Sequence, residues 1–429
     1  MSWSNWAGNQ TMTPARVVRP TSVDELSAAV KQAAADDLRV KPIGSGHSFT
    51  AIGLTDGVQV DMSGLAGLVS VDQASGLVTA QAGLPLHQLN AALREHGLGL
   101  TNMGDIDRQT VSGAVSTGTH GTGRESAGFA MQLAGLELVL ADGSVISCSK
   151  SERPELFEMA RVGLGALGVL SSVTFQAEPA FLLRADERPM PLADVLDGFE
   201  EHVASNEHFE FYWFPHTDLA LTKRNNRTTD AAPLGRFRKA FDDELLSNGL
   251  FRLTCGLGSL APAVIPRVNR IAARALSART YADSAPYVYT SPRRVRFCEM
   301  EYAIPRSELP AIFRELRTLP EKHGLRVSFP VEVRVAPADD VPLSTAFGRD
   351  SAYIAVHMFK GSSFDAYFNA VEKLVGEVGG RPHWGKLHTL TAADLRQRYP
   401  RFDEFVAMRD QLDPQRRFGN AYLERVLGS

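Results

Sequence analysis

The stretch Ser112-Gly-Ala-Val-Ser-Thr-Gly-Thr-His-Gly-Thr-Gly123 is the most distinctive part of this sequence. Nine of its twelve residues are glycine, serine or threonine, and none carries a formal charge. Such a segment can bring many backbone N–H groups and hydroxyls close to a ligand, because no bulky side chain keeps the backbone away. Successive N–H groups form concave sites that suit anions such as a pyrophosphate. An ordinary surface loop is the alternative interpretation of these residues, which we call the glycine-rich segment.

A second small-residue loop, Gly44-Ser-Gly-His-Ser48, follows a predicted strand at 39–43. With two such loops in one chain, a common binding site for an anionic ligand and two ordinary surface loops are about equally good interpretations. The small neighbours of His47 leave its imidazole accessible as a neutral nucleophile, although a lone histidine is more often structural or solvated. Gly163-Leu-Gly-Ala-Leu-Gly168 matches the dinucleotide pattern GxGxxG. It follows a predicted helix at 154–161 and precedes a strand at 169–175, which is the reverse of a Rossmann unit.

Hydrophobic periodicity predicts two regions that differ in the length and order of their strands and helices. Residues 1–180 alternate short strands with helices, such as 22–37 and 85–97, and include a hairpin that turns at Asp142-Gly143. From about residue 180 glycine becomes rarer, and longer strands alternate with helices, which is typical of an antiparallel α+β domain. The predicted strands there are 209–214, 297–304, 327–335 and 352–358, and the predicted helices are 309–319 and 364–378. We expect the basic stretch 223–250 to be a loop.

Composition limits the class of protein. The 429 residues suggest two or three domains, and 44% hydrophobic with 22% charged residues excludes a disordered or fibrous chain. The net charge of −4 does not indicate a nucleic-acid partner. Cys148, Cys255 and Cys298 form no CxxC pair, so we expect reduced thiols in the cytoplasm. We find neither a signal peptide nor a transmembrane segment.

Two further motifs carry charge. Glu332 and Arg334 alternate with valines, so strand geometry places both on one face. They are either an exposed ion pair or the lining of a polar pocket. His383-Trp-Gly-Lys386 combines a cation with a tight turn, and a solvated loop is its alternative interpretation. His383 and His388 lack helical i, i+4 spacing, so we expect no metal site.

Together these motifs resemble the aldonolactone oxidoreductase branch of the vanillyl-alcohol-oxidase type of FAD enzymes, which includes gulonolactone, arabinonolactone and alditol oxidases. The resemblance begins at Asn5-Trp-Ala-Gly8 and covers nearly the whole chain. It implies an α+β fold with a two-subdomain PCMH-type FAD-binding domain (1–180). A cap domain with a large antiparallel sheet flanked by helices (181–380) and a C-terminal segment returning to the FAD domain (381–429) would follow.

The same resemblance implies roles for individual residues. His47 would carry FAD through a covalent bond, and glycine at Gly104 would admit oxygen to the flavin. Glu332, Arg334 and Lys386 would act on the substrate, with His357 and Phe359 nearby; Phe359 favours a cyclic lactone over a linear alditol. The remaining residues expected at the cofactor are Gly44, Ser45, Gly46, Ser48, Asp105, Ser112, Gly113, Ser116, Thr117, Gly118, His120, Gly121, Gly168 and Val169.

The expected activity is FAD-dependent oxidation of an L-gulono- or D-arabinono-1,4-lactone type substrate, by hydride transfer from a carbinol carbon to flavin N5. Oxidation of an alditol or another sugar-like primary alcohol is the alternative. Oxygen or a redox protein would accept the electrons. The resemblance also allows peripheral membrane association of a cytoplasmic protein.

Overall fold

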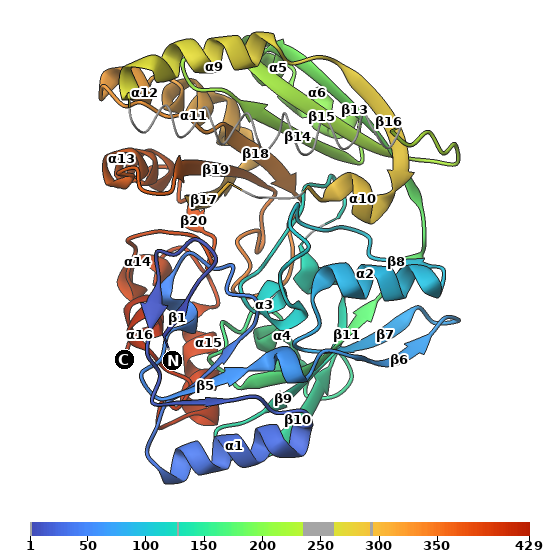
Figure 1. Cartoon of the computed structure of the whole chain (residues 1–429), viewed down its shortest axis with the longest axis vertical. Coiled ribbons are helices and arrows are strands. Elements are labelled where there is room, and N and C mark those ends of the chain that lie inside the picture. Colours follow the sequence, from blue (N-terminus) through green and yellow to red (C-terminus); the bar gives the residue numbers. More distant parts are fainter. Residues whose placement is uncertain (1, 127, 235–260, 292–294) are drawn as a thin grey trace.

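A computed structural model describes residues 2–126, 128–234, 261–291 and 295–429 of the chain. Its strands form two large sheets and three small ones, and the largest sheet lies on one side of the molecule, above the others in Figure 1. None of the helices in the described ranges combines the length and apolar character needed to cross a bilayer.

The first part of the chain contains two of the sheets. A parallel sheet has the order β3 (Arg16–Val18), β5 (Val58–Asp61), β4 (Val40–Ile43). An antiparallel sheet has the order β10 (Val145–Ser149), β9 (Leu133–Val139), β11 (Val169–Gln176), β7 (Leu77–Gln81), β6 (Leu68–Asp72). Helices α1 (Val23–Ala35), α2 (Leu86–Glu95), α3 (Val111–Ser116) and α4 (Pro154–Ala160) pack around them. Two-stranded pairs β1 (Trp3–Ser4) with β2 (Thr11–Met12), and β8 (Leu98–Gly99) with β12 (Glu178–Pro179), complete this part.

The local signals of this region are confirmed. Ser22 caps α1 by accepting a hydrogen bond from the Glu25 N–H, and the hairpin β9–β10 turns at Asp142-Gly143 as expected. The inverted GxGxxG motif lies between α4 and β11, so it does not open a helix. No helix was predicted in the glycine-rich segment, but its residues up to Ser116 belong to α3, because Val111, Ala114 and Val115 bury an apolar face.

The second part forms one antiparallel sheet, which we call the cap sheet. Its strand order is β16 (Arg279–Ser284), β13 (Leu182–Pro191), β15 (Leu219–Thr228), β14 (His208–Trp213), β18 (Val331–Ala336), β19 (Ser351–Phe359), β17 (Phe297–Pro305), β20 (Arg381–Pro382). The helices of this part are α5 (Leu192–Asp197), α6 (Phe199–Ala204), α9 (Ile265–Arg274), α10 (Ala285–Tyr289), α11 (Leu309–Leu316), α12 (Leu319–Lys322) and α13 (Asp365–Gly376). In Figure 1, α5, α6, α9, α11 and α12 lie above the sheet and α10 lies below it.

The four predicted strands of this region are present, and the loop expected over 223–250 is confirmed for 229–234 but wrong for the residues before them. Residues 223–228 belong to the long strand β15, and 235–250 fall outside the described residues. The basic side chains tolerate a strand because acids lie beside them. Lys223 lies 3.3 Å from Glu210 of the neighbouring β14, and Arg227 lies 2.7 Å from Glu178 of β12, which belongs to another sheet.

The C-terminal residues pack beside the N-terminal ones. Helices α14 (Ala392–Arg396), α15 (Phe402–Leu412) and α16 (Ala421–Leu427) lie next to the blue N-terminal strands in Figure 1. Their apolar side chains, such as Phe405 and Leu423, share one buried cluster with Leu26 and Val60. Asn420 donates to three carbonyls of residues 51–54, so the end of the chain is fastened to its beginning.

Candidate active site

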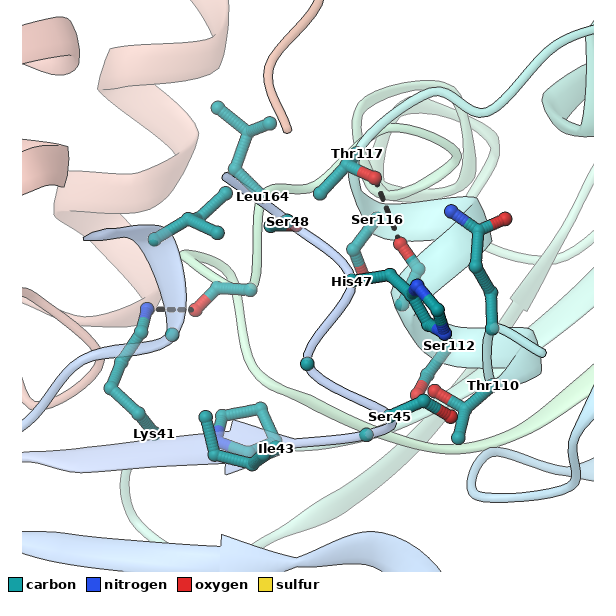
Figure 2. Close-up of a pocket in the computed structure, with 18 of the residues that line it drawn as sticks. Lys41, Ile43, Ser45, His47, Ser48, Thr110, Ser112, Ser116, Thr117 and Leu164 are labelled. Atoms are coloured by element: carbon teal, nitrogen blue, oxygen red, sulfur yellow. Dashed lines mark hydrogen bonds between the residues drawn. The ribbon is translucent and has the colours of Figure 1, made fainter. Parts of the chain in front are cut away.

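An open pocket lies between the Gly44–Ser48 loop and the start of the glycine-rich segment. Figure 2 shows Ser45 and His47 of the loop together with Ser112, Ser116 and Thr117, all of which line the pocket. The chain can approach itself this closely because Gly44 has no side chain: a Cβ there would collide with Thr110 Oγ1. Gly46 has φ +67°, a conformation that glycine adopts without strain.

The donors of this pocket fit a phosphate-containing group. Its lining residues include no aspartate or glutamate, whereas the buried ammonium of Lys41 reaches the Gly165 carbonyl at 3.3 Å. Burial lowers the pKa of Lys41 to about 7, against the opposing effect of Asp413. Within the described residues, Thr110 Oγ1 and the backbone N–H groups of 45–48 have no hydrogen-bond acceptor. Unused donors beside a buried cation suit a pyrophosphate.

Several residues predicted at the cofactor do not line this pocket: Gly104, Asp105, Gly118, His120, Gly121 and Val169. Val169 lies in the hydrophobic core, and its neighbour Leu170 faces the pocket instead. The other five residues lie outside the pocket, and two of them contact the cap sheet: Asp105 lies 3.2 Å from Arg334 and His120 lies 3.0 Å from Glu301. The glycine-rich segment reaches that sheet where the Gly123 N–H donates to the Val335 carbonyl at 2.9 Å.

The cap sheet has one apolar and one polar face. Alternate residues of β14, β17, β18 and β19, such as Phe211, Met300 and Val333, join a buried cluster with the covering helices. The intervening residues therefore share the opposite face. Register pairs put Tyr212 beside Glu332, Glu332 beside Ala355, and Ala355 beside Glu301. One row of this polar face thus contains two buried glutamates with a small residue between them.

Arg334 is the cation at the centre of the polar face. It forms an ion pair with Glu332 on its own strand and lies 3.2 Å from Asp105 and 3.4 Å from Glu210. Burial alone would lower the pKa of Arg334, but these three carboxylates raise it well above its usual value. The Tyr212 hydroxyl donates to Glu332 at 2.9 Å. The predicted pair is therefore buried, with 5% of Glu332 and 8% of Arg334 exposed.

Lys386 lies where the polar face meets the pocket. Its ammonium contacts Glu299 and lies 4.0 Å from Glu301, while His357 Nε2 lies 3.4 Å from Glu299. The loop that carries Lys386 also touches the pocket loop, because the Phe49 N–H donates to the Gly385 carbonyl at 2.7 Å. Burial, reinforced by the nearby Lys386 charge, lowers the pKa of His47 to about 4. Phe359 packs at the edge of a small aromatic cluster with Phe297 and Phe329.

Six residues of the site were not predicted from the sequence: Lys41 and Thr110 in the pocket, and Glu210, Tyr212, Glu299 and Glu301 on the polar face. A signal for the acids was present: charged residues alternate with large apolar ones in Phe209-Glu-Phe211 and in Cys298-Glu-Met-Glu-Tyr302. Such alternation predicts a strand with one polar face, as it did for residues 331–335.

Comparison with known proteins agrees with this architecture. A family model of the FAD binding domain matches residues 14–149, and a model of D-arabinono-1,4-lactone oxidase matches residues 173–426. The fold is that of an FAD-dependent oxidoreductase, with an FAD-binding domain and a second domain built on a large antiparallel sheet. The chain belongs to the D-arabinono-1,4-lactone oxidase family of these enzymes.

Two relatives cover almost the whole chain. An L-gulono-1,4-lactone dehydrogenase of Mycobacterium tuberculosis is 45% identical over 99% of both chains. The L-gulonolactone oxidase of Bos taurus is 34% identical over 99% of this chain and 98% of its own. Among solved structures, cholesterol oxidase from B. sterolicum superposes with a TM-score of 0.85 at 19% identity, covering 99% of this chain and 96% of its own, which shows a shared fold.

Proposed function

We propose that this enzyme oxidises a sugar-derived lactone of the L-gulono- or D-arabinono-1,4-lactone type at C2. The names of its relatives support this substrate class. When bound, the flavin accepts the hydride that leaves the carbinol carbon. The observation that carries the proposal is the buried Arg334, held between Asp105 of the FAD-binding part and the acids of the cap sheet.

The side chains would divide the work as follows. Glu332 would accept a hydrogen bond from a substrate hydroxyl, since its position is already fixed by Tyr212 and Arg334. Arg334 and Lys386 are cations that would stabilise an alkoxide or the anionic reduced cofactor. Because they are held in place before the substrate arrives, little reorganisation is required during the reaction. His357 and Phe359 would border the substrate from β19.

Residues of the pocket would hold the pyrophosphate of FAD, namely the 44–48 loop with Ser112, Gly113, Ser116 and Thr117. Gly104, Asp105, Gly118, His120 and Gly121 would continue along the cofactor, and Gly168 would lie by its adenosine half. We further propose that His47 carries the flavin covalently. Its low pKa keeps the imidazole neutral at neutral pH, and neither ring nitrogen has a hydrogen-bond partner among the described residues.

We assign residues 1–180 and 381–429 to the FAD-binding domain and its C-terminal extension, and 181–380 to the cap. We also propose that oxygen or a redox protein reoxidises the cofactor. A cytoplasmic location, with or without peripheral membrane association, is supported by Cys148 and Cys298, which are buried free thiols.

A substrate panel with an active-site variant tests the proposed function. Purified enzyme should reduce its flavin with L-gulono- or D-arabinono-1,4-lactone far faster than with xylitol or sorbitol; the opposite order would favour an alditol oxidase. Arg334→Ala should lose turnover by a factor of about 100 or more, the size expected for removing a fixed charge-stabilising group, while retaining FAD. Unchanged turnover would contradict the proposed role.

Acid precipitation tests the covalent link. Yellow colour should remain in the pellet of the wild-type protein and should move to the supernatant for His47→Ala. Colour in the wild-type supernatant would exclude attachment through His47.

A further inference from the structure

Two glutamates of β17 lie where three distant parts of the chain meet. Glu299 and Glu301 are two residues apart, so both side chains lie on the polar face of the cap sheet, and they are only 5% and 4% exposed. Glu299 contacts Lys386 of the C-terminal loop and lies 3.4 Å from His357 of β19. Glu301 lies 3.0 Å from His120 of the glycine-rich segment.

The backbone fastens the loop that carries Lys386 to the same strand. The His383 N–H donates to the Glu301 carbonyl at 3.0 Å, and the Leu387 N–H donates to the Glu299 carbonyl at 2.9 Å. These bonds enclose Lys386, so its ammonium lies within reach of both carboxylates. Both the main chain and the side chains of β17 therefore determine where this cation stands.

The charges of this cluster support one another. Burial alone would lower the pKa of Lys386, but Glu299 and Glu301 raise it above the ordinary lysine value. Burial acts in the opposite direction on a carboxyl group and would raise the pKa of Glu301. His120 and Lys386 nevertheless hold this pKa below its ordinary value. His120 Nδ1 faces the Gly121 carbonyl at 2.9 Å and Nε2 faces Glu301 at 3.0 Å, so the ring bridges the two acceptors.

His120, Glu301 and His383 lie together within a network of hydrogen bonds. Their ligand atoms lie within 4.8 Å of one another. However, His383 Nδ1 already accepts the Gly385 N–H at 3.0 Å, and His120 Nε2 already faces Glu301. The Lys386 ammonium at 4.0 Å from Glu301 would also repel a divalent cation.

We propose that Glu299 and Glu301 are positioning residues that hold the Lys386 ammonium at the junction of the cofactor pocket and the cap sheet. Glu299 additionally orients His357, and Glu301 ties the cation to His120 of the glycine-rich segment. This inference rests on the proposed function, in which Lys386 stabilises negative charge during lactone oxidation. A fixed, fully charged ammonium is worth more at such a site than a mobile one, because it needs no reorganisation during the reaction.

Glu299→Gln and Glu301→Gln in the FAD-loaded enzyme test the proposal. Each replaces a carboxylate by an amide of the same shape. We expect kcat to fall about tenfold or more with little change in KM, equivalent to about 1.4 kcal/mol of barrier. The alkaline limb of the kcat profile should move toward neutral pH, because the amide no longer stabilises the ammonium. Glu299→Asp should restore part of the rate. The matched control is Glu187→Gln, a buried glutamate of the same sheet that contacts Arg279 at 2.6 Å and should leave the profile unchanged.

A readout that is independent of turnover separates the two proposals. In protein with 13C-labelled lysine, the Cε resonance that disappears in Lys386→Met reports the protonation of Lys386. In Glu299→Gln this Lys386 resonance should titrate at a lower pH than in the wild type. In Glu187→Gln it should titrate at the same pH as in the wild type. A titration that is unchanged in both Glu299→Gln and Glu301→Gln would overturn the positioning role. A shifted titration in an enzyme that oxidises no lactone would overturn the proposed function alone.

Discussion

Glu332 on β18 and Glu301 on β17 are both paired in register with Ala355 of the strand between them. Neighbouring strands lie about 4.8 Å apart, so the two carboxylates stand on either side of a single methyl group. Each contacts a different centre of the candidate site, Glu332 the Arg334 guanidinium and Glu301 the His120 imidazole. The spacing of the two centres is therefore set by the sheet and by the small side chain at 355.

Ala355→Leu should impair catalysis without removing the flavin. The larger side chain would press on both carboxylates and displace the groups that they hold, and overpacking of this kind costs about 1–3 kcal/mol. We expect kcat/KM for the lactone to fall about tenfold or more, with unchanged flavin content. Steady-state kinetics measure kcat/KM for Ala355→Leu and for the control Ala355→Gly. The control adds no volume, so its kcat/KM should stay close to that of the wild type. A wild-type kcat/KM for Ala355→Leu would show that catalysis does not depend on the spacing of Glu332 and Glu301 across Ala355.

Lys41→Met should weaken FAD binding. The Lys41 ammonium is buried beside the pocket and, among the described residues, donates to the carbonyl oxygens of Gly165 and Phe418. An anionic cofactor would add to the stabilising charge of Asp413. Losing a charge-assisted contact costs about 1.5–3 kcal/mol, or roughly tenfold to a hundredfold in Kd. Flavin titration in a His47→Ala background, where binding is reversible, measures the change. Lys31→Met on the exposed surface of α1 is the control, and equal affinities for the two variants would argue against a phosphate near Lys41.

Gly104→Ala should slow reoxidation by oxygen. A Cβ at this position would lie 3.2 Å from the His120 carbonyl oxygen and 3.3 Å from a Thr119 methyl group, so it fits after a shift of a few tenths of an ångström. If Gly104 admits oxygen, the added methyl should lower the reoxidation rate about tenfold, or about 1.4 kcal/mol of barrier, and leave flavin reduction by the lactone unchanged. Stopped-flow measurement of both half-reactions distinguishes this result from general damage, which would slow both.

Acid should destabilise the protein through two buried histidines. Burial lowers the pKa of His383 and that of His388 to about 3, from an unfolded value near 6.5. Between these values the unfolded chain binds more protons than the folded one. Stability is therefore complete above about pH 6.5 and decreases as the pH falls, by about 1.4 kcal/mol per pH unit for each histidine.

Urea denaturation at several pH values measures this dependence. His388→Gln should remove about one proton from the slope, since glutamine at this position does not titrate in that range. The same slope in the variant and the wild type would show that His388 is not neutral in the folded protein.

The sequence by itself determined the local features. The cap of α1, the hairpin at Asp142-Gly143 and the shared face of Glu332 and Arg334 depend on residues that are close along the chain. The order of the motifs identified the family. Local sequence patterns did not predict two elements that depend on tertiary packing. The basic residues of β15 are neutralised by acids on other strands, and the apolar face of α3 is buried by the core.

The composition of the candidate site was decided by the tertiary structure alone. Asp105, Glu210 and Arg334 come together because a loop of the first part of the chain meets two neighbouring strands of the cap sheet. Lys386 reaches Glu299 because the C-terminal loop bonds to β17 across 87 residues of sequence. Periodicity shows which face of a strand a charge occupies, but not which distant strand will lie beside it. That choice depends on long-range packing, which also determines whether a charge is buried and paired or left in water.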